Sequence, residues 1–170
     1  MQRIHFETEH SLFRESFRSF LQKEVIPNQE RWEEAGMVDR EVWVKAGEMG
    51  FLLPWADEAY GGLGIKDFRY EQIMSEELAY INEPGFMLPL HSALCGPYIT
   101  EYGNEEQKQR FLPAIIRGEC ILAVAMTEPG AGSDLAGMRT SAVDKGDHDL
   151  LNGSKTYISN GLLSDLVIVA

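Results

Sequence analysis

The hydrophobic pattern of the chain changes its period once, near residue 120. Before that point apolar residues recur every three or four positions, which predicts amphipathic helices. In the first helix Phe13, Phe17 and Phe20 share one face, and Pro27 is expected to end or kink it. After Cys120 short apolar runs separated by Gly and Pro predict strands. The pattern therefore predicts a mainly α chain with a β part.

Capping and breaking residues bound the other helices. They are expected at 39–49 with Met49 facing inward, at 67–78 before an Asn-Glu-Pro-Gly break, at 90–102, and at 104–117 behind a capping box of Asn104 and Gln107. The 90–102 segment is apolar on most faces, with Leu90, Leu94, Tyr98 and Ile99 in one stripe, so it is expected to be a central buried helix. Residues 54–64 are rich in turn formers and are predicted to form a surface loop.

Short strands are expected at 121–126, 140–144, 150–151, 156–159 and 166–170. Asn152-Gly153 predicts the turn of a hairpin between two of them. No turn or polar run follows Leu166 to Ala170, whereas a finished domain normally closes its last element. The expected organisation is a helical domain over 1–120 and the start of an incomplete β domain over 121–170.

Composition excludes several classes of partner. The chain has 170 residues, a formal net charge of -12 and a pI near 4.7, which argues against nucleic acid and anionic membranes because both require clustered Lys and Arg. No apolar run approaches the ~20 residues of a membrane helix. Cys95 and Cys120 lie far apart, and the first residues do not read as a signal or transit peptide. A bacterial cytoplasmic protein with two reduced thiols is the expectation, and a mature organellar protein is the alternative.

A candidate binding corner follows the first predicted strand. The apolar run stops at Thr127 and turns into a loop in which Gly130 and Gly132 permit φ > 0 and expose bare backbone. Thr127, Ser133 and the loop amides are suitable donors for an anionic or carbonyl-rich ligand. On chemistry alone this is a phosphate or ring-edge site, and an ordinary turn explains the same residues equally well.

Two nucleotide-binding motifs fail on spacing at this corner. A dinucleotide fingerprint needs a third glycine where Leu135 stands, and a helix where strands are predicted. A P-loop needs Lys and Ser/Thr where Ser133 and Asp134 stand.

The segments AMTEPGAGSDLAG and LNGSKTYISNG resemble the paired signature of the acyl-CoA dehydrogenase family of flavoenzymes. Further segments of the chain occur in the order found in that family: FRESFRSFLQKEVIP, DREVWVKAGEMGFL, YGGLG, YGNEEQKQRFLP and GEC. Nearly the whole chain is covered. AMTEPGAGSDL, and ISNG with SDLVIVA, are most similar to the long-chain branch.

The resemblance implies a fold and a cofactor. Family members have an N-terminal helical domain, a β-barrel-like middle domain and a C-terminal helical bundle, of which the last is absent here. FAD is expected between the middle domain and the bundle. The residues implied in cofactor binding are Val124, Met126, Thr127, Gly132, Ser133, Tyr157, Ile158 and Ser159. Ser133 is also expected to touch the acyl-CoA substrate, and Ser159 to place its hydroxyl near flavin N5.

The resemblance also implies an activity. Family members oxidise fatty acyl-CoA to trans-2-enoyl-CoA and pass electrons to an electron-transferring flavoprotein, commonly as homo-oligomers. Their catalytic base is a glutamate of the C-terminal bundle, so no catalytic residue is expected here and the isolated chain is predicted to be inactive. Glu128 and Asp134 are interpreted as structural. The four histidines show no ligand spacing, so no metal is expected.

Two departures from the family pattern affect the prediction. Many relatives have Trp where Tyr157 stands and Thr where Ser159 stands. The aromatic ring and the hydroxyl are therefore retained, while the reduction potential of the flavin and the fit of the electron acceptor are not predicted. Acyl-CoA oxidases, nitroalkane oxidases and flavin monooxygenases resemble dehydrogenases over the same residues. A non-enzymatic helical interaction module is an alternative of a different class.

Overall fold

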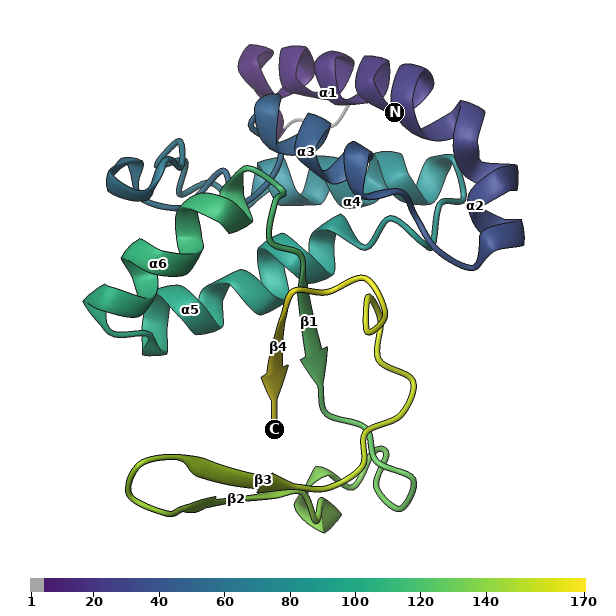
Figure 1. Ribbon diagram of the computed structural model, residues 1–170. Helices are drawn as coiled ribbons and strands as arrows, with labels where there is room; N and C mark the ends of the chain where they lie inside the picture. The colour runs from purple at the N-terminus through teal and green to yellow at the C-terminus, as the bar shows by residue number, and fades with distance from the viewer. Residues whose placement is uncertain (1–4) are drawn as a thin grey trace.

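The computed structural model describes residues 5–170 (Figure 1). Residues 1–4 lie outside the described residues, and the prediction that the first residues form no signal or transit peptide falls partly on them. In Figure 1 α1, α3 and α4 form one end of the molecule, α5 and α6 lie between them and β1 and β4, and the β2–β3 hairpin is at the far end. Within residues 5–170 every α-helix precedes residue 117 and every strand follows residue 121, which confirms the mainly α fold with a β part.

The α-helices are α1 (Thr8–Phe20), α2 (Gln29–Ala35), α3 (Arg40–Glu48), α4 (Arg69–Tyr80), α5 (Gly96–Tyr102) and α6 (Glu105–Ile116). Single π-helical segments occur at η1 (Leu21–Val25) and η4 (Leu90–Cys95), and 3₁₀ turns at η2 (Ile26–Asn28), η3 (Glu58–Tyr60) and η5 (Leu135–Gly137). The capping box that opens α6 is confirmed, because Asn104 Oδ1 accepts from Gln107 N–H and Gln107 Oε1 accepts from Asn104 N–H, both at 2.9 Å.

The chain stays helical around Pro27 instead of forming a loop after the first helix. The chain passes through η1 and η2 into α2, a helix that the periodicity did not predict. Pro27 is tolerated because it occupies the first positions of a new turn, where its missing N–H has no partner to lose. The helical course then buries Trp32 at 4% exposure.

The expectation that Met49 faces inward is wrong. Helix α3 ends at Glu48, and the Met49 side chain is 53% exposed. The stretch 54–64 also departs from a plain surface loop, because it contains η3 and begins with Pro54 and Ala56 buried.

The core of the molecule is aromatic and aliphatic, lies mostly among the helices and extends to the start of β1. Phe17 and Phe51 pack edge to face with ring centroids 4.9 Å apart, and Trp43 meets Phe86 in the same way at 4.8 Å. Full burial of one such side chain stabilises the fold by about 1.5–3 kcal/mol. Apolar packing therefore holds the helical part together.

The predicted stripe of the 90–102 segment is half right, because Leu90 and Ile99 pack partly buried against the core and the other two residues do not. Leu94 and Tyr98 are 46% and 38% exposed, and the buried face carries His91 and Ser92 instead. The buried positions 91, 92, 95 and 96 keep helical spacing, so the error lies in taking the larger apolar residues to mark the buried face. The buried face also needs small residues: a Cβ at Gly96 would lie 2.8 Å from a Leu53 methyl carbon.

The β part contains two separate pairs of strands. β1 (Leu122–Ala125) is parallel to β4 (Leu166–Val169), and β2 (Ser141–Asp144) is antiparallel to β3 (Asp149–Asn152). The predicted strand at 156–159 is not formed, and the β2–β3 turn lies at 145–148, where Gly146 has φ +94°. Asn152-Gly153 is therefore not the hairpin turn. Gly153 instead permits a close approach, since a Cβ there would lie 2.2 Å from the Thr140 hydroxyl oxygen.

Candidate functional site

The first segment of the candidate site is a tight turn at the end of β1. Glu128 N–H donates to the Ala131 carbonyl at 2.9 Å, and Ala131 N–H donates back to the Glu128 carbonyl at 3.1 Å. Gly130 and Gly132 do not adopt the positive φ that the sequence allowed. A Cβ at either glycine would meet nothing within 4 Å, so both present backbone to open space. This face suits close approach of a ligand.

The second segment carries unusual backbone conformations. Tyr157 and Asn160 have φ of +57° and +61°, a region that non-glycine residues adopt at a cost of roughly 1–3 kcal/mol. The Tyr157 ring is 91% exposed, so burial does not offset that cost. Asn160 is held in place, since its Nδ2 donates to the Leu122 carbonyl at 3.2 Å. Strained residues that present an exposed aromatic ring are typical of functional sites.

Three contacts join the two segments. Thr156 N–H donates to the Thr127 carbonyl at 3.0 Å. The Lys155 ammonium donates to the Met126 carbonyl at 3.0 Å and to Glu128 Oε1 at 2.9 Å. The sequence motifs therefore lie side by side in the fold, although some thirty residues separate them in the chain.

Glu128 has the structural role that the sequence suggested. Its carboxylate, 8% exposed, accepts from the backbone N–H groups of Arg139 at 2.7 Å and Thr140 at 2.8 Å, besides Lys155. The Thr140 side chain, these two N–H groups and the ammonium lower the pKa of Glu128 to about 2. A carboxylate with this pKa is a weak proton acceptor at neutral pH.

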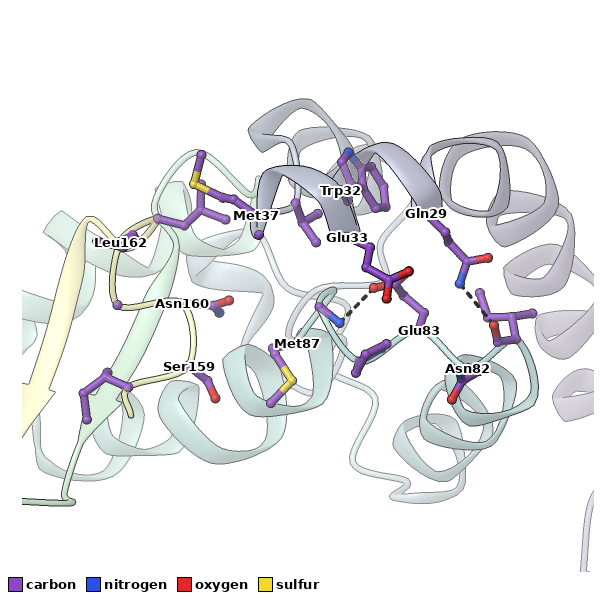
Figure 2. Close-up of a pocket in the computed structure, with 18 residues that line it drawn as sticks. Gln29, Trp32, Glu33, Met37, Asn82, Glu83, Met87, Ser159, Asn160 and Leu162 are labelled. Atoms are coloured by element: carbon purple, nitrogen blue, oxygen red, sulfur yellow. Dashed lines mark hydrogen bonds between the residues drawn. The ribbon is translucent and has the colours of Figure 1, made fainter. Parts of the chain in front are cut away.

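A pocket of about 960 Å³ lies between the end of α2, the 81–87 loop and the 158–163 loop (Figure 2). Figure 2 shows Met37 and Leu162 near Asn160 and Ser159, and Met87 between Ser159 and Glu83. Among the predicted cofactor-binding residues only Ile158 and Ser159 line this pocket. Val124, Met126, Thr127, Gly132, Ser133 and Tyr157 lie outside it. The structure thus brings the two segments together without gathering all eight residues around one cavity.

Sequence reasoning missed His91, which links the helices to β1. Its ring is buried; Nδ1 accepts from Leu122 N–H at 3.2 Å, and Nε2 then donates to the Ile115 carbonyl at 3.3 Å. Burial lowers the pKa of His91 to about 4, so the ring is neutral at pH 7. Arg40 makes a second link, from α3 to the Leu163 carbonyl at 2.8 Å and to Asp165 at 2.7 Å. The spacing of apolar residues along the 90–102 segment gave no sign that position 91 would be buried and hydrogen-bonded on both sides of its ring.

One acidic group in the described residues has side-chain ligand atoms close enough to hold a cation. Those of Glu7, Glu9 and His10 lie within 4.8 Å of one another. Both His10 nitrogens already have partners, since Nδ1 accepts from Glu7 N–H and Nε2 lies 3.2 Å from the Asp67 carboxylate. The group therefore has no histidine nitrogen to offer. Among residues 5–170, no helix is both long and apolar enough to span a bilayer.

Comparison with known proteins decides the family. The family model "Acyl-CoA dehydrogenase, N-terminal domain" matches residues 7–119, and the model "Acyl-CoA dehydrogenase, middle domain" matches residues 123–170. The chain belongs to the acyl-CoA dehydrogenase family. The fold agrees: a crystal structure of an acyl-CoA dehydrogenase from Geobacillus kaustophilus matches with a TM-score of 0.94 and 48% identity, over 99% of this chain and 44% of that chain.

Two further relatives narrow the position within the acyl-CoA dehydrogenase family. The mitochondrial long-chain specific acyl-CoA dehydrogenase of Mus musculus is 52% identical over 164 residues, which are 96% of this chain and 38% of that protein. An acyl-CoA dehydrogenase from Bacillus anthracis complexed with FAD matches with a TM-score of 0.89 and 32% identity, over 99% of this chain and 29% of that chain. The chain spans about two fifths, or less, of the length of these relatives. Its likeness to long-chain members agrees with the motifs.

Proposed function

We propose that the protein containing these residues is an FAD-dependent dehydrogenase of fatty acyl-CoA. It oxidises the α,β bond of the thioester to the trans-2-enoyl-CoA, acts as a homo-oligomer and passes electrons to an electron-transferring flavoprotein. The observation that carries the proposal is the pairing of the two motif segments through Thr127, Lys155 and Thr156. That pairing sets exposed hydroxyls and open backbone on two adjacent loops.

The donor set of these loops fits a flavin and its pyrophosphate. Ser133 and Ser159 are exposed, and the backbone at Gly132 faces open space that a Cβ would partly fill. FAD, when bound, would accept a hydride from the β carbon of the substrate. Ser159 then donates a hydrogen bond to the ring edge, Met126 and Thr127 contact the ring, and Gly132 and Ser133 hold phosphate oxygens. Donors fixed in these positions favour the negative charge that develops on reduction.

Tyr157, Ile158 and Val124 complete the proposed cofactor contacts. The backbone of Tyr157 is strained, and its exposed ring is not buried in a way that would offset the free energy of that strain. We assign it to the flavin face, where an aromatic surface stacks. Ser133 is exposed in the first segment and is proposed to touch the acyl-CoA ligand as well.

The catalytic base is proposed to lie outside these residues. Glu128, the carboxylate next to the site, has a pKa near 2 and is held by three partners, so it is unsuited to abstract the α proton. We therefore propose that residues 1–170 alone do not turn over acyl-CoA. The division into a helical domain over 1–120 and a β domain over 121–170 is part of the same proposal, and so is a bacterial cytoplasmic location.

The test is anaerobic titration of the whole protein with acyl-CoA thioesters. We expect the visible flavin absorbance to bleach with a long-chain thioester such as palmitoyl-CoA, and much less with isovaleryl-CoA. Bleaching by a nitroalkane, or reaction of the reduced flavin with oxygen at the rate of an oxidase, would place the protein in another branch. A protein that holds no flavin would favour the non-enzymatic module.

A further inference from the structure

We propose that Lys155 is a positioning residue that, with Glu128, fixes the two cofactor-facing segments relative to each other. The proposal rests on the proposed function, because it assigns the purpose of the contact to flavin binding. Lys155 is not itself placed against the flavin. Its effect is transmitted through the backbone of Met126 and the carboxylate of Glu128.

The contacts of the Lys155 ammonium leave it no free donor. It donates to the Met126 carbonyl at 3.0 Å, to Glu128 Oε1 at 2.9 Å and toward Met138 Sδ at 3.7 Å. An ammonium has three N–H groups, and each has a partner here. The Lys155 and Glu128 side chains are 12% and 7% exposed, so solvent replaces these bonds poorly. A lost ammonium would leave Glu128 buried without its cation.

Glu128 extends the connection to a third part of the β region. Its two carboxylate oxygens accept from the N–H groups of Arg139 and Thr140, at the entry to β2. One ion pair thus joins the end of β1, the entry to β2 and the residue two positions before Tyr157. The β2–β3 hairpin adds little apolar packing here, because residues 141–154 are all exposed. The contacts that join the two segments directly are therefore polar.

The rest of the connection is too weak to do this alone. One further backbone bond, Thr156 N–H to the Thr127 carbonyl, joins the segments directly, and Asn160 ties the second segment to β1 at 3.2 Å. A cofactor that contacts both segments needs their separation held to within about 0.5 Å. Lys155 sits between the two segments and contacts the backbone of the first directly, so its removal is expected to loosen both.

The experiment compares flavin binding in whole-protein variants. Lys155→Met removes the ammonium while keeping the chain length, and Lys155→Arg retains a cation. Lys66→Met is the matched control, because its ammonium also donates to a backbone carbonyl, that of Trp55 at 2.6 Å, away from the site. The double variant Glu128→Gln/Lys155→Met leaves no buried charge unpaired. We measure the FAD dissociation constant, the flavin reduction potential, the urea unfolding midpoint, and amide hydrogen exchange.

We expect Lys155→Met and the double variant to weaken FAD binding at least tenfold and to shift the reduction potential. The unfolding midpoint of the double variant, which leaves no buried charge unpaired, should move no further than that of Lys66→Met, and Lys155→Arg should restore most of the affinity. Faster exchange is expected at 126–128 and at 156–157 together. Unchanged FAD affinity in Lys155→Met and in the double variant, or a loss of affinity in the double variant that is matched by a fall in its unfolding midpoint, overturns the proposal and leaves the proposed function intact.

The two proposals fail in distinguishable ways. A wild-type protein that holds no flavin overturns the proposed function. In that case faster exchange in both segments of Lys155→Met still supports the connection itself, whereas exchange confined to one segment overturns it too.

Discussion

The helical and β regions of this chain are stabilised by different means. The helical region buries Phe17, Trp43 and Phe51 almost completely, in one apolar cluster. In the β region the start of β1 joins that cluster, but residues 141–154 are exposed throughout, and the buried ion pair of Glu128 and Lys155 lies between the two loops. The comparison teaches that the helices form a stable platform, while a few polar bonds hold the loops proposed to bind the cofactor. Loops on a rigid scaffold are a common arrangement for a binding site.

The largest effect on stability is expected from the helical core. Phe17→Ala should lower the free energy of unfolding by about 3–5 kcal/mol, because it removes a ring that packs against Phe13, Phe20 and Phe51. Urea unfolding followed by circular dichroism measures the change. Phe68→Ala is the control, since that ring is 73% exposed and its loss should cost less than about 0.5 kcal/mol. Equal losses of unfolding free energy in the two variants would contradict the conclusion that the buried apolar cluster stabilises the helical region.

His91 should make the junction between the regions sensitive to acid. Its folded-state pKa of about 4 lies below the usual 6.5, so the unfolded chain binds more protons between these values and stability falls as pH drops through this window. The loss from pH 7 to pH 4 should be about 3 kcal/mol, from 1.36 kcal/mol per unit. His91→Gln should remove this part of the pH dependence, measured by urea unfolding at both pH values. The exposed His148→Gln should leave it unchanged, and a wild-type slope retained in His91→Gln would refute the assignment.

Glu71 should act in the opposite direction. This carboxylate of α4 is 4% exposed, neither of its oxygens has a partner, and burial raises its pKa to about 7. The folded state therefore binds the extra proton, and stability is lost as pH rises from about 4.5 through 7. Glu71→Gln should be more stable than wild type by about 2–3 kcal/mol at pH 8 and equal to it below pH 4.5.

Urea unfolding at pH 4.5 and pH 8 measures the Glu71 effect. Glu34→Gln, at an exposed position of α2, should give no such difference. A Glu71→Gln protein less stable than wild type at pH 8 would show that the carboxylate has a partner in solution.

The smallest effect is expected in the β2–β3 hairpin. Leu151 is 55% exposed, so Leu151→Ser should change the free energy of unfolding by less than about 0.5 kcal/mol. The measurement is the same urea titration. A loss above 2 kcal/mol in the whole protein would show that another surface covers the hairpin, and the contrast between the two regions would then have to be redrawn.

The sequence predicted what depends on local patterns. Helical periodicity identified α1, α3, α4 and α6, and the capping box of Asn104 and Gln107 was recognised from its spacing. The missed features depend on register or on distant contacts. Within η4 the polar His91 is buried and the apolar Leu94 is exposed, which hydrophobic periodicity does not predict.

The hairpin was misplaced for a similar reason. Asn152-Gly153 has the composition of a turn, but its glycine permits the close approach of Thr140. The tie between Lys155 and Glu128 spans 27 positions, so no local rule reveals it. The two motif segments were recognised as words of a family pattern, while the contact that joins them needed the structure.

The most direct test of the central claim is amide hydrogen exchange on the whole protein before and after removal of flavin. We expect residues 126–133 and 157–159 to lose protection together, while the helical core around Phe17 and Trp43 and the exposed hairpin at 141–152 stay unchanged. Loss confined to one segment, or changes only in the helices, would contradict a cofactor site built from the two loops.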